Sequence, residues 1–206
     1  TVMFVEKSIS TGNGIEPLSL PRGNPVSKVR KPSEGAPRDR RLTNSEWAAL
    51  EKQCEKSRNP WLLPALRFAA ETAMRQAEML SLTWNSVDMG RRMLLLGDPS
   101  RIKNSEARGV PLSTKALKIL EGLPREGELV FPVKRAALHY VFNGAVKRAK
   151  ITDFTWHDIR HEALSRLAER GDMTILELAA VSGHKTLQML KRYTHLETQR
   201  LAEKIG

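Results

Sequence analysis

The C-terminal part of this chain holds residue types that together could carry out chemistry on a phosphate. His157 and Arg160 are three positions apart, so on a helix they are neighbours on one face. Gly183-His184 puts a second histidine 24 residues after Arg160, and Tyr193 follows nine residues later. A phenol can attack a phosphodiester, but with a pKa near ~10 in water it needs cations and a base at neutral pH. Tyr193 with these neighbours is therefore a candidate nucleophile.

A second guanidinium group is expected elsewhere in the chain. Attack on a phosphodiester adds negative charge to the phosphoryl oxygens, and arginine suits that charge because it stays protonated and donates paired hydrogen bonds. One arginine to consider is Arg75, in the run ETAMRQAEMLSLTWNSVD, where Glu78, one turn later, could hold Arg75 or a neighbouring helix by hydrogen bonds. Taken alone, Arg75 could simply complement the dipole of a helix that it ends.

Several local signals predict the helices that position these residues. Thr43 and Glu46 form a capping box at the start of one helix. Asn59-Pro60 indicates the start of a second helix, which we expect to end at Arg75. Ser113 caps a helix that runs to Leu123. Further helices are expected at residues 134–149, in the stretch that begins at His157, and at 196–205.

Short strands are expected between these helices. Residues 87–89, 93–96 and 109–112 have the pattern of a small antiparallel sheet. The predicted fold is therefore α+β and mainly α-helical, a helical domain with a three-stranded antiparallel sheet. Tyr140, the other tyrosine, lies in the middle of a predicted helix among apolar residues and is expected in the core, which leaves Tyr193 as the nucleophile.

The N-terminal part has a different composition. Residues 1–11 are expected to be the end of a helix, and residues 12–37 hold five Pro and four Gly in 26 positions, which is typical of a linker. Seven basic and two acidic residues lie from Arg22 to Arg41, both included. This stretch is expected to be either a solvated tether or a basic strap along a DNA backbone. The start at Thr1 suggests a fragment or a processed product.

Composition limits the class of protein. The 206 residues suffice for one domain with a sizeable core, and the net charge of +11 favours an anionic partner, most simply nucleic acid, although a membrane surface would also fit. No run of 18 apolar residues and no signal peptide pattern occurs, so we expect a cytoplasmic protein with no membrane partner. Cys54, the only cysteine, excludes an internal disulfide and disfavours a cysteine metal site.

A zinc site formed by His157, His161, His184 and Asp158 is not expected, although His157 and His161 have the i, i+4 spacing of a zinc-binding pair. A metalloprotease needs glutamate between such a pair in His-Glu-x-x-His, and here Arg160 lies between them, where a cation is unfavourable. No metal is therefore predicted. The chain also has no Gly-rich loop of the kind that cradles phosphates, so no cofactor such as ATP is predicted either. His161 is expected to have only a hydrogen-bonding role, and His195 a structural or solvent-facing one.

In this order and at these spacings, the motifs resemble the tyrosine recombinases, the phage integrase family. The segment around Arg75 resembles the first signature box and His157 to His195 the second, and the resemblance covers roughly Arg41 to Gly206. Ala73 lies where the family often has glycine, which should alter backbone freedom more than chemistry. The expected domains are residues 1–41, an interdomain linker with the possible remnant of an N-terminal DNA-binding domain, and 42–206, the catalytic domain.

The resemblance implies a site-specific DNA recombinase. Tyr193 would attack a DNA phosphate to form a 3′-phosphotyrosyl link. Lys103, in the connection before the Arg-Gly-Val-Pro-Leu run at 108–112, would be the general acid for the leaving 5′ oxygen. Arg75 and Arg160 would clamp the non-bridging oxygens. His157 would accept or relay the tyrosyl proton, and His184 would donate a hydrogen bond to the phosphate.

The same resemblance implies the partners. They are a double-stranded DNA recombination site, further copies of the chain in a homotetramer on DNA, and accessory DNA-bending proteins. Two alternatives stay open. A type IB topoisomerase uses similar groups to nick and reseal one strand, and a DNA-binding regulator could keep the fold without catalysis.

Overall fold

The computed structural model describes residues 40–97, 108–184, 186–190, 193 and 205, together with strands at 9–11 and 14–16. The chain divides into two compact units, Thr1–Arg38 and Asp39–Gly206. In the first unit, β1 (Ile9–Thr11) pairs with β2 (Gly14–Glu16) in an antiparallel hairpin. The helix end predicted for residues 1–11 is therefore wrong at 9–11. The dipeptide between the strands, Gly-Asn, is of the kind that favours a tight hairpin.

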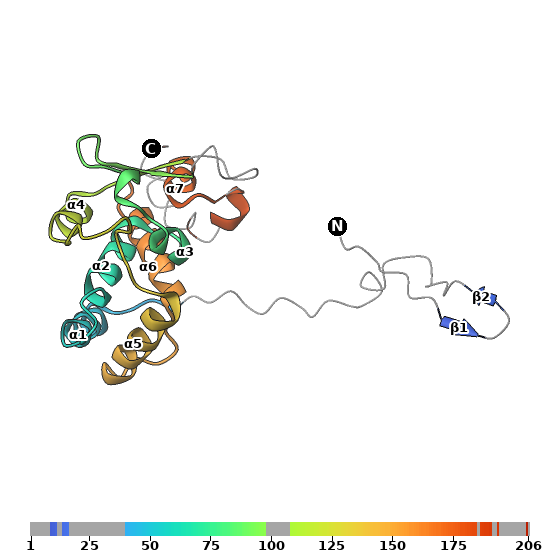
Figure 1. The fold of residues 1–206 in the computed structure, drawn as a ribbon. Helices are drawn as coiled ribbons and strands as arrows, with labels where there is room; N and C mark the ends of the chain where they lie inside the picture. The colour runs from blue at the N-terminus through green and yellow to red at the C-terminus, as the bar shows by residue number, and fades with distance from the viewer. Residues whose placement is uncertain are drawn as a thin grey trace. The chain divides into compact units, whose positions relative to one another are not determined.

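The second unit combines helices with a small sheet (Figure 1), as the sequence predicted. The helices are α1 (Asn44–Glu55), α2 (Leu62–Thr72), α3 (Gln76–Leu80), α4 (Thr114–Glu121), α5 (Arg135–Arg148), α6 (Trp156–Glu169) and α7 (Ile175–Ser182), with a 3-10 turn, η2, at Trp84–Ser86. Strands β3 (Val87–Asp88), β4 (Met93–Leu96) and β5 (Arg108–Pro111) form an antiparallel sheet in that order. The helix expected at 196–205 lies outside the described residues, apart from Ile205.

The predicted helix starts are confirmed where a side chain caps the backbone. Thr43 Oγ1 accepts a hydrogen bond from the backbone N–H of Glu46 at 3.2 Å, and Glu46 Oε2 accepts from that of Thr43 at 2.9 Å. Ser113 Oγ accepts from the backbone N–H of Ala116 at 3.0 Å and caps α4. Asn59 precedes α2, but the helix itself begins only at Leu62.

The end of α2 differs from the prediction. The helix stops at Thr72 because Ala73 adopts a left-handed conformation with φ of +51°, and Arg75 instead precedes α3. An L residue pays about 1–2 kcal/mol for this backbone conformation, and glycine does not. The conformation explains why glycine would suit this position. The alanine carbonyl is in turn held by Arg160, whose Nη1 donates to it at 2.5 Å.

Two buried clusters support the domain. The main core joins α1, α2, α4, α5 and the sheet around large buried side chains, with Phe68 and Phe131 in ring contact at 5.4 Å. A second, smaller cluster links α6 and α7 and includes Ala163, Leu178, Leu190 and Tyr193. Helix α6 packs against both α2 and α7, so it connects the two clusters.

The prediction that Tyr140 is a core residue is wrong. Its side chain is 82% exposed on α5. The buried residues of this helix include Leu138 and Phe142, each two positions away from Tyr140. Two positions on an α-helix correspond to about 200°, which turns Tyr140 away from the core.

The domain's first residues are anchored on α6. Arg41 Nε lies 3.1 Å from Glu162 Oε2, and Arg166 Nε lies 2.7 Å from Glu162 Oε1. Burial alone would raise the pKa of the Glu162 carboxyl, but hydrogen bonds from Arg41 and Arg166 hold it below its ordinary value. Among the described helices, none has the length and apolar character needed to span a bilayer.

Candidate active site

Within the described residues, the C-terminal end of α7 gathers three arginine side chains, called here the arginine cluster. Arg108 on β5 donates Nη1 to the carbonyl of Val181 at 2.7 Å. Arg160 on α6 donates Nη2 to the carbonyl of Ser182 at 2.7 Å, and Arg75 donates Nη2 to that of Gly183 at 2.9 Å. The last carbonyls of a helix lack partners within it and carry the negative end of its dipole, so they favour cations.

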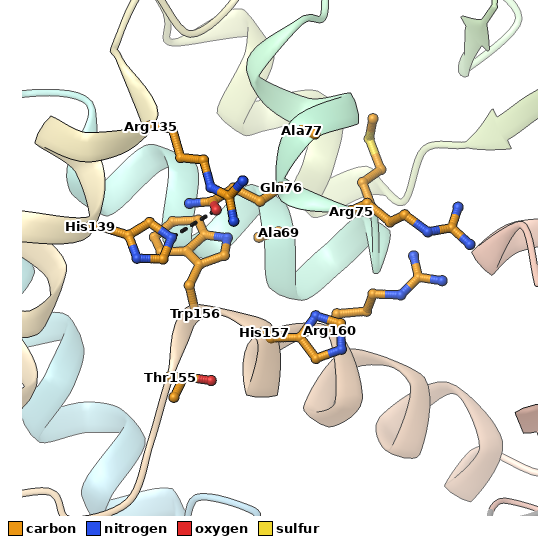
Figure 2. A pocket seen from close by; sticks show the side chains of 11 residues that line it. Ala69, Arg75, Gln76, Ala77, Arg135, His139, Thr155, Trp156, His157 and Arg160 are labelled. Atoms are coloured by element: carbon orange, nitrogen blue, oxygen red, sulfur yellow. Dashed lines mark hydrogen bonds between the residues drawn. The ribbon is translucent and has the colours of Figure 1, made fainter. Parts of the chain in front are cut away.

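Arg75 and Arg160 have different environments in this cluster. Arg160 is only 5% exposed, and burial, followed by repulsion from Arg75, lowers the pKa of its guanidinium to about 10. It is therefore still charged at neutral pH. Arg75 is exposed, and Figure 2 shows its guanidinium near that of Arg160 at one end of a pocket. The structure thus places near each other the two arginines that the sequence analysis assigned to one site, and their role there stays a prediction.

Glu78 connects Arg75 with Arg108. Its Oε1 accepts from Arg75 Nη1 at 2.9 Å, and its Oε2 accepts from Arg108 Nη2 at 2.7 Å and from the backbone N–H of Arg75 at 3.0 Å. Burial would raise the pKa of the Glu78 carboxyl, but the two guanidinium groups hold it below its ordinary value. Because this carboxylate offsets only part of the charge of the arginine cluster, the site favours an anion.

Arg108 was not identified as a site residue from the sequence. It had been noted only as part of the run that follows Lys103. On β5 the buried residue is Val110, and Arg108 lies two positions earlier, on the same side of the strand. An arginine at an inward-facing strand position was the signal that could have identified it.

Gly183 allows these arginines to approach α7. Its φ of +66° is left-handed, and a Cβ added here would lie 2.6 Å from both Cζ and Nε of Arg108. Arg108 cannot easily move aside, since it is held by Glu78 and by the carbonyl of Val181. The glycine is therefore required both by the helix end and by the close packing of the arginine cluster.

Gly183→Ala is expected to lower the free energy of unfolding by about 1–2 kcal/mol from backbone strain. It should also displace Arg108 and so weaken anion binding at the site. Thermal unfolding and sulfate titration would measure the two effects. Gly127→Ala is the matched control, because an added Cβ there meets nothing within 4 Å. Parental stability and parental sulfate affinity in Gly183→Ala would contradict the packing argument.

His184 is a hydrogen-bond acceptor in this arrangement. Arg160 Nη2 lies 3.3 Å from His184 Nε2, and an arginine can only donate. On the other side of the ring, Nδ1 lies 2.7 Å from Ser182 Oγ, which itself donates to the carbonyl of Leu178 at 2.6 Å. The network thus assigns the proton of a neutral ring to Nδ1. Burial, followed by repulsion from Arg160 and Arg75, lowers the pKa of His184 to about 4.

Stability is expected to fall as the pH is lowered from about 6.5 to about 4, and His184 should contribute to this slope. Its pKa drops from 6.5 to about 4 on folding, so in this range the unfolded chain binds the proton and the folded chain does not. The contribution is at most about 1.4 kcal/mol per pH unit. Urea unfolding at several pH values would measure it. His184→Gln should flatten the slope relative to the parental chain.

The two histidines of α6 lie on the same side of the helix. His161 Nδ1 is 3.0 Å from the Tyr193 hydroxyl oxygen, and Tyr193 is only 4% exposed. The rings of His157 and His161 meet edge to face with centroids 4.8 Å apart. His157 is exposed. The sequence prediction gave His161 a hydrogen-bonding role but did not identify Tyr193 as its partner.

A pocket of about 290 Å³ extends from the arginines toward α5 (Figure 2). Its size is close to the lower limit of small-ligand pockets, about 300 Å³. Arg75, His157 and Arg160 line one end. Arg135, His139 and Gln76 line the other, where His139 Nε2 lies 2.8 Å from Gln76 Oε1. The pocket thus joins the arginine cluster to further cationic and polar groups.

Lys103 and His195 lie outside the described residues, so the general-acid role predicted for Lys103 stays a prediction. Across the part of the chain that is described, His, Cys, Asp and Glu side chains form no group of three or more that could hold a metal ion.

Comparisons with known proteins find a matching family and related chains. The model of the phage integrase family matches residues 40–200. The shufflon-specific DNA recombinase of Escherichia coli is 40% identical over 186 residues, covering 89% of this chain and 47% of that protein. The integrase of Salmonella phage P22 is 29% identical over 197 residues, covering 87% of this chain and 49% of that integrase. The chain spans about half the length of these curated relatives.

The fold also matches that of a solved structure. The catalytic domain of bacteriophage HP1 integrase superposes with a TM-score of 0.64 at 27% identity, covering 80% of this chain and 94% of that domain. The matched family region extends from before Arg75 to beyond Tyr193.

Proposed function

The chain belongs to the phage integrase family, and from this membership we propose that it carries the catalytic domain of a site-specific DNA recombinase. Residues 42–206 are the catalytic domain, and residues 1–41 are a linker with the end of an N-terminal DNA-binding domain. The ion pair between Arg41 and Glu162 anchors the end of that linker. The observation that best supports the proposal is that α6 carries both Arg160, which donates to the end of α7 within the arginine cluster, and His161, whose Nδ1 lies 3.0 Å from the Tyr193 hydroxyl oxygen.

The proposed reaction is a pair of transesterifications. The Tyr193 oxygen attacks a DNA phosphorus, and a 3′-phosphotyrosine forms while the 5′ oxygen leaves with a proton from Lys103. The 5′ hydroxyl of a partner strand then attacks the phosphotyrosine and releases Tyr193. Because one ester replaces another in each step, the proposed reaction uses no cofactor and no metal.

The arginines are suited to bind the non-bridging oxygens. Each guanidinium has five N–H donors, and the carbonyls of α7 occupy only some of those of Arg75 and Arg160. The other donors can bind a phosphate without loss of the contacts that position them. Since these contacts exist before DNA binds, the charge is preorganised for the transition state. For His184 to donate to the phosphate as well, its Nε2 must first gain a proton, by protonation or a change of tautomer.

The partners in this proposal are a double-stranded DNA recombination site, further copies of the chain and accessory DNA-bending proteins. The net charge of +11 supports binding to DNA. Since recombination requires two cuts at each of two sites, a homotetramer is the proposed active assembly. The proposed location is the cytoplasm.

Covalent capture of DNA tests the proposal. The protein in its full length is incubated with a random pool of nicked duplexes, denatured, and any DNA that stays attached is amplified and sequenced. We expect an enriched site and an adduct whose peptide map places the nucleotide on Tyr193. Site-specific DNA binding without an adduct would favour the non-catalytic regulator. An adduct with relaxation of supercoils by a monomer, but no strand exchange, would favour the topoisomerase.

A further inference from the structure

We propose that His161 holds the Tyr193 hydroxyl and accepts its proton during the attack, whereas His157 faces the phosphate. The inference rests on the proposed function. It moves the role of proton acceptor, which the sequence analysis had placed on His157, to His161 and makes His161 a catalytic residue.

The position of Tyr193 supports this assignment. The ring is packed in the small apolar cluster with Ala163, Leu178 and Leu190, which leaves 4% of its surface exposed. Its hydroxyl nevertheless lies 3.0 Å from His161 Nδ1, a normal hydrogen-bond length. A general base must be within such a distance of the proton that it removes, and His161 satisfies this condition before DNA is bound.

The position of His157 suits a different role. His157 lines the pocket beside Arg75 and Arg160 (Figure 2), where a phosphate would be bound. His161 follows four residues later on α6, so both rings project from one side of the helix. Their edge-to-face contact at 4.8 Å places the two histidines next to each other, one lining the pocket and the other beside the tyrosine.

The proton balance of the step is complete. As the bond from Tyr193 Oη to phosphorus forms and the bond from phosphorus to the 5′ oxygen breaks, the phenol proton passes to His161 Nδ1. Before the step Nδ1 must be unprotonated, so a neutral His161 carries its proton on Nε2. The leaving 5′ oxygen receives a proton from Lys103. On rejoining, both protons return by the same routes, and His161 then protonates the departing tyrosine.

The first test compares His161→Asn with the matched variant His157→Asn. Asparagine places a polar group close to the position of Nδ1 but cannot accept a proton at neutral pH. Single-turnover cleavage by the full-length protein is measured on a nicked duplex that carries the site found by covalent capture. It should be about 100-fold slower in His161→Asn, and a loss of this size lies within the range of general-base catalysis. The melting temperature of each variant shows whether it folds, and His161→Gln is the second variant if His161→Asn does not.

A more acidic phenol distinguishes proton transfer from positioning. Fluorinated tyrosine can replace both tyrosines of the chain, Tyr140 and Tyr193, and it gives up its proton more readily. We expect this replacement to raise the cleavage rate of His161→Asn at least tenfold and to leave the cleavage rate of His157→Asn unchanged. Parental cleavage by His161→Asn, or a recovery confined to His157→Asn, would overturn the inference.

A measurement without DNA separates this inference from the proposed function. The fluorine NMR spectrum should contain signals of Tyr140 and of Tyr193, which Tyr140→Phe and Tyr193→Phe identify. His161→Asn should shift the Tyr193 signals and leave those of Tyr140 in place. If the parent forms no adduct on any DNA, the proposed function fails whatever the spectrum shows. If the parent forms the adduct but the Tyr193 signals do not respond to His161→Asn, the inference alone fails.

Discussion

Tyr193→Phe is expected to abolish covalent attachment of the protein to DNA while its fold and its DNA affinity are kept. The change removes only the oxygen that attacks phosphorus in the proposed reaction. The buried ring keeps its contacts in the small cluster, so the cost in unfolding free energy should be about 1 kcal/mol, the value of one hydrogen bond. The adduct is measured on a denaturing gel, DNA affinity by fluorescence anisotropy and stability by thermal unfolding.

Tyr140→Phe is the matched control for this experiment. It removes the same atom from the other tyrosine, whose side chain is 82% exposed on α5. Adduct formation by Tyr140→Phe should equal that of the parent. A persistent adduct in Tyr193→Phe would assign the attack to another side chain and would leave the contact with His161 without a catalytic meaning.

Arg160→Lys is expected to slow DNA cleavage by about 100- to 1000-fold, the loss typical for one preorganised donor at a charged transition state. Lysine keeps the positive charge, but a single ammonium group cannot reproduce the planar fork that bonds to the carbonyls of both Ala73 and Ser182. The loss should fall on the single-turnover rate more than on DNA affinity, because Arg75 and Arg108 keep the site positive.

Arg166→Lys is the control for Arg160→Lys. Arg166 lies on the same helix and pairs with Glu162, whereas Arg160 is held at the end of α7. Its replacement should leave the cleavage rate within about twofold of the parental value, and thermal unfolding should report any change at the Glu162 pair. Equal rates for Arg160→Lys and the parent would show that charge alone, without the paired geometry, meets the demand of the reaction.

The features predicted correctly from sequence depend on short stretches of the chain. Side-chain caps at Thr43 and Ser113 marked helix starts because the capping residue and its partner are three positions apart. The three-stranded sheet was predicted from short runs separated by turn residues. The fold class followed from these local signals, and the family resemblance supplied Arg75 and Arg160 as partners.

The features that were missed depend on contacts between distant segments. Alanine favours helices, so nothing local indicated that α2 would end in a left-handed Ala73; its carbonyl instead accepts a bond from Arg160. Likewise, Arg108 enters the site through Glu78 and the carbonyl of Val181. The pairing of His161 with Tyr193 joins residues from separate segments, which spacing alone cannot specify.

The atoms at the end of α7 that accept hydrogen bonds from the arginine cluster are main-chain carbonyl oxygens. Substitution of Val181 or Ser182 changes a side chain but leaves its carbonyl in place, provided that the helix still ends at the same residue. The sequence of α7 can therefore diverge widely without loss of the acceptors that orient Arg75, Arg108 and Arg160. A sequence search that weights the identity of α7 would overlook distant members that keep this site. The length of the helix and the glycine that follows it are the better markers.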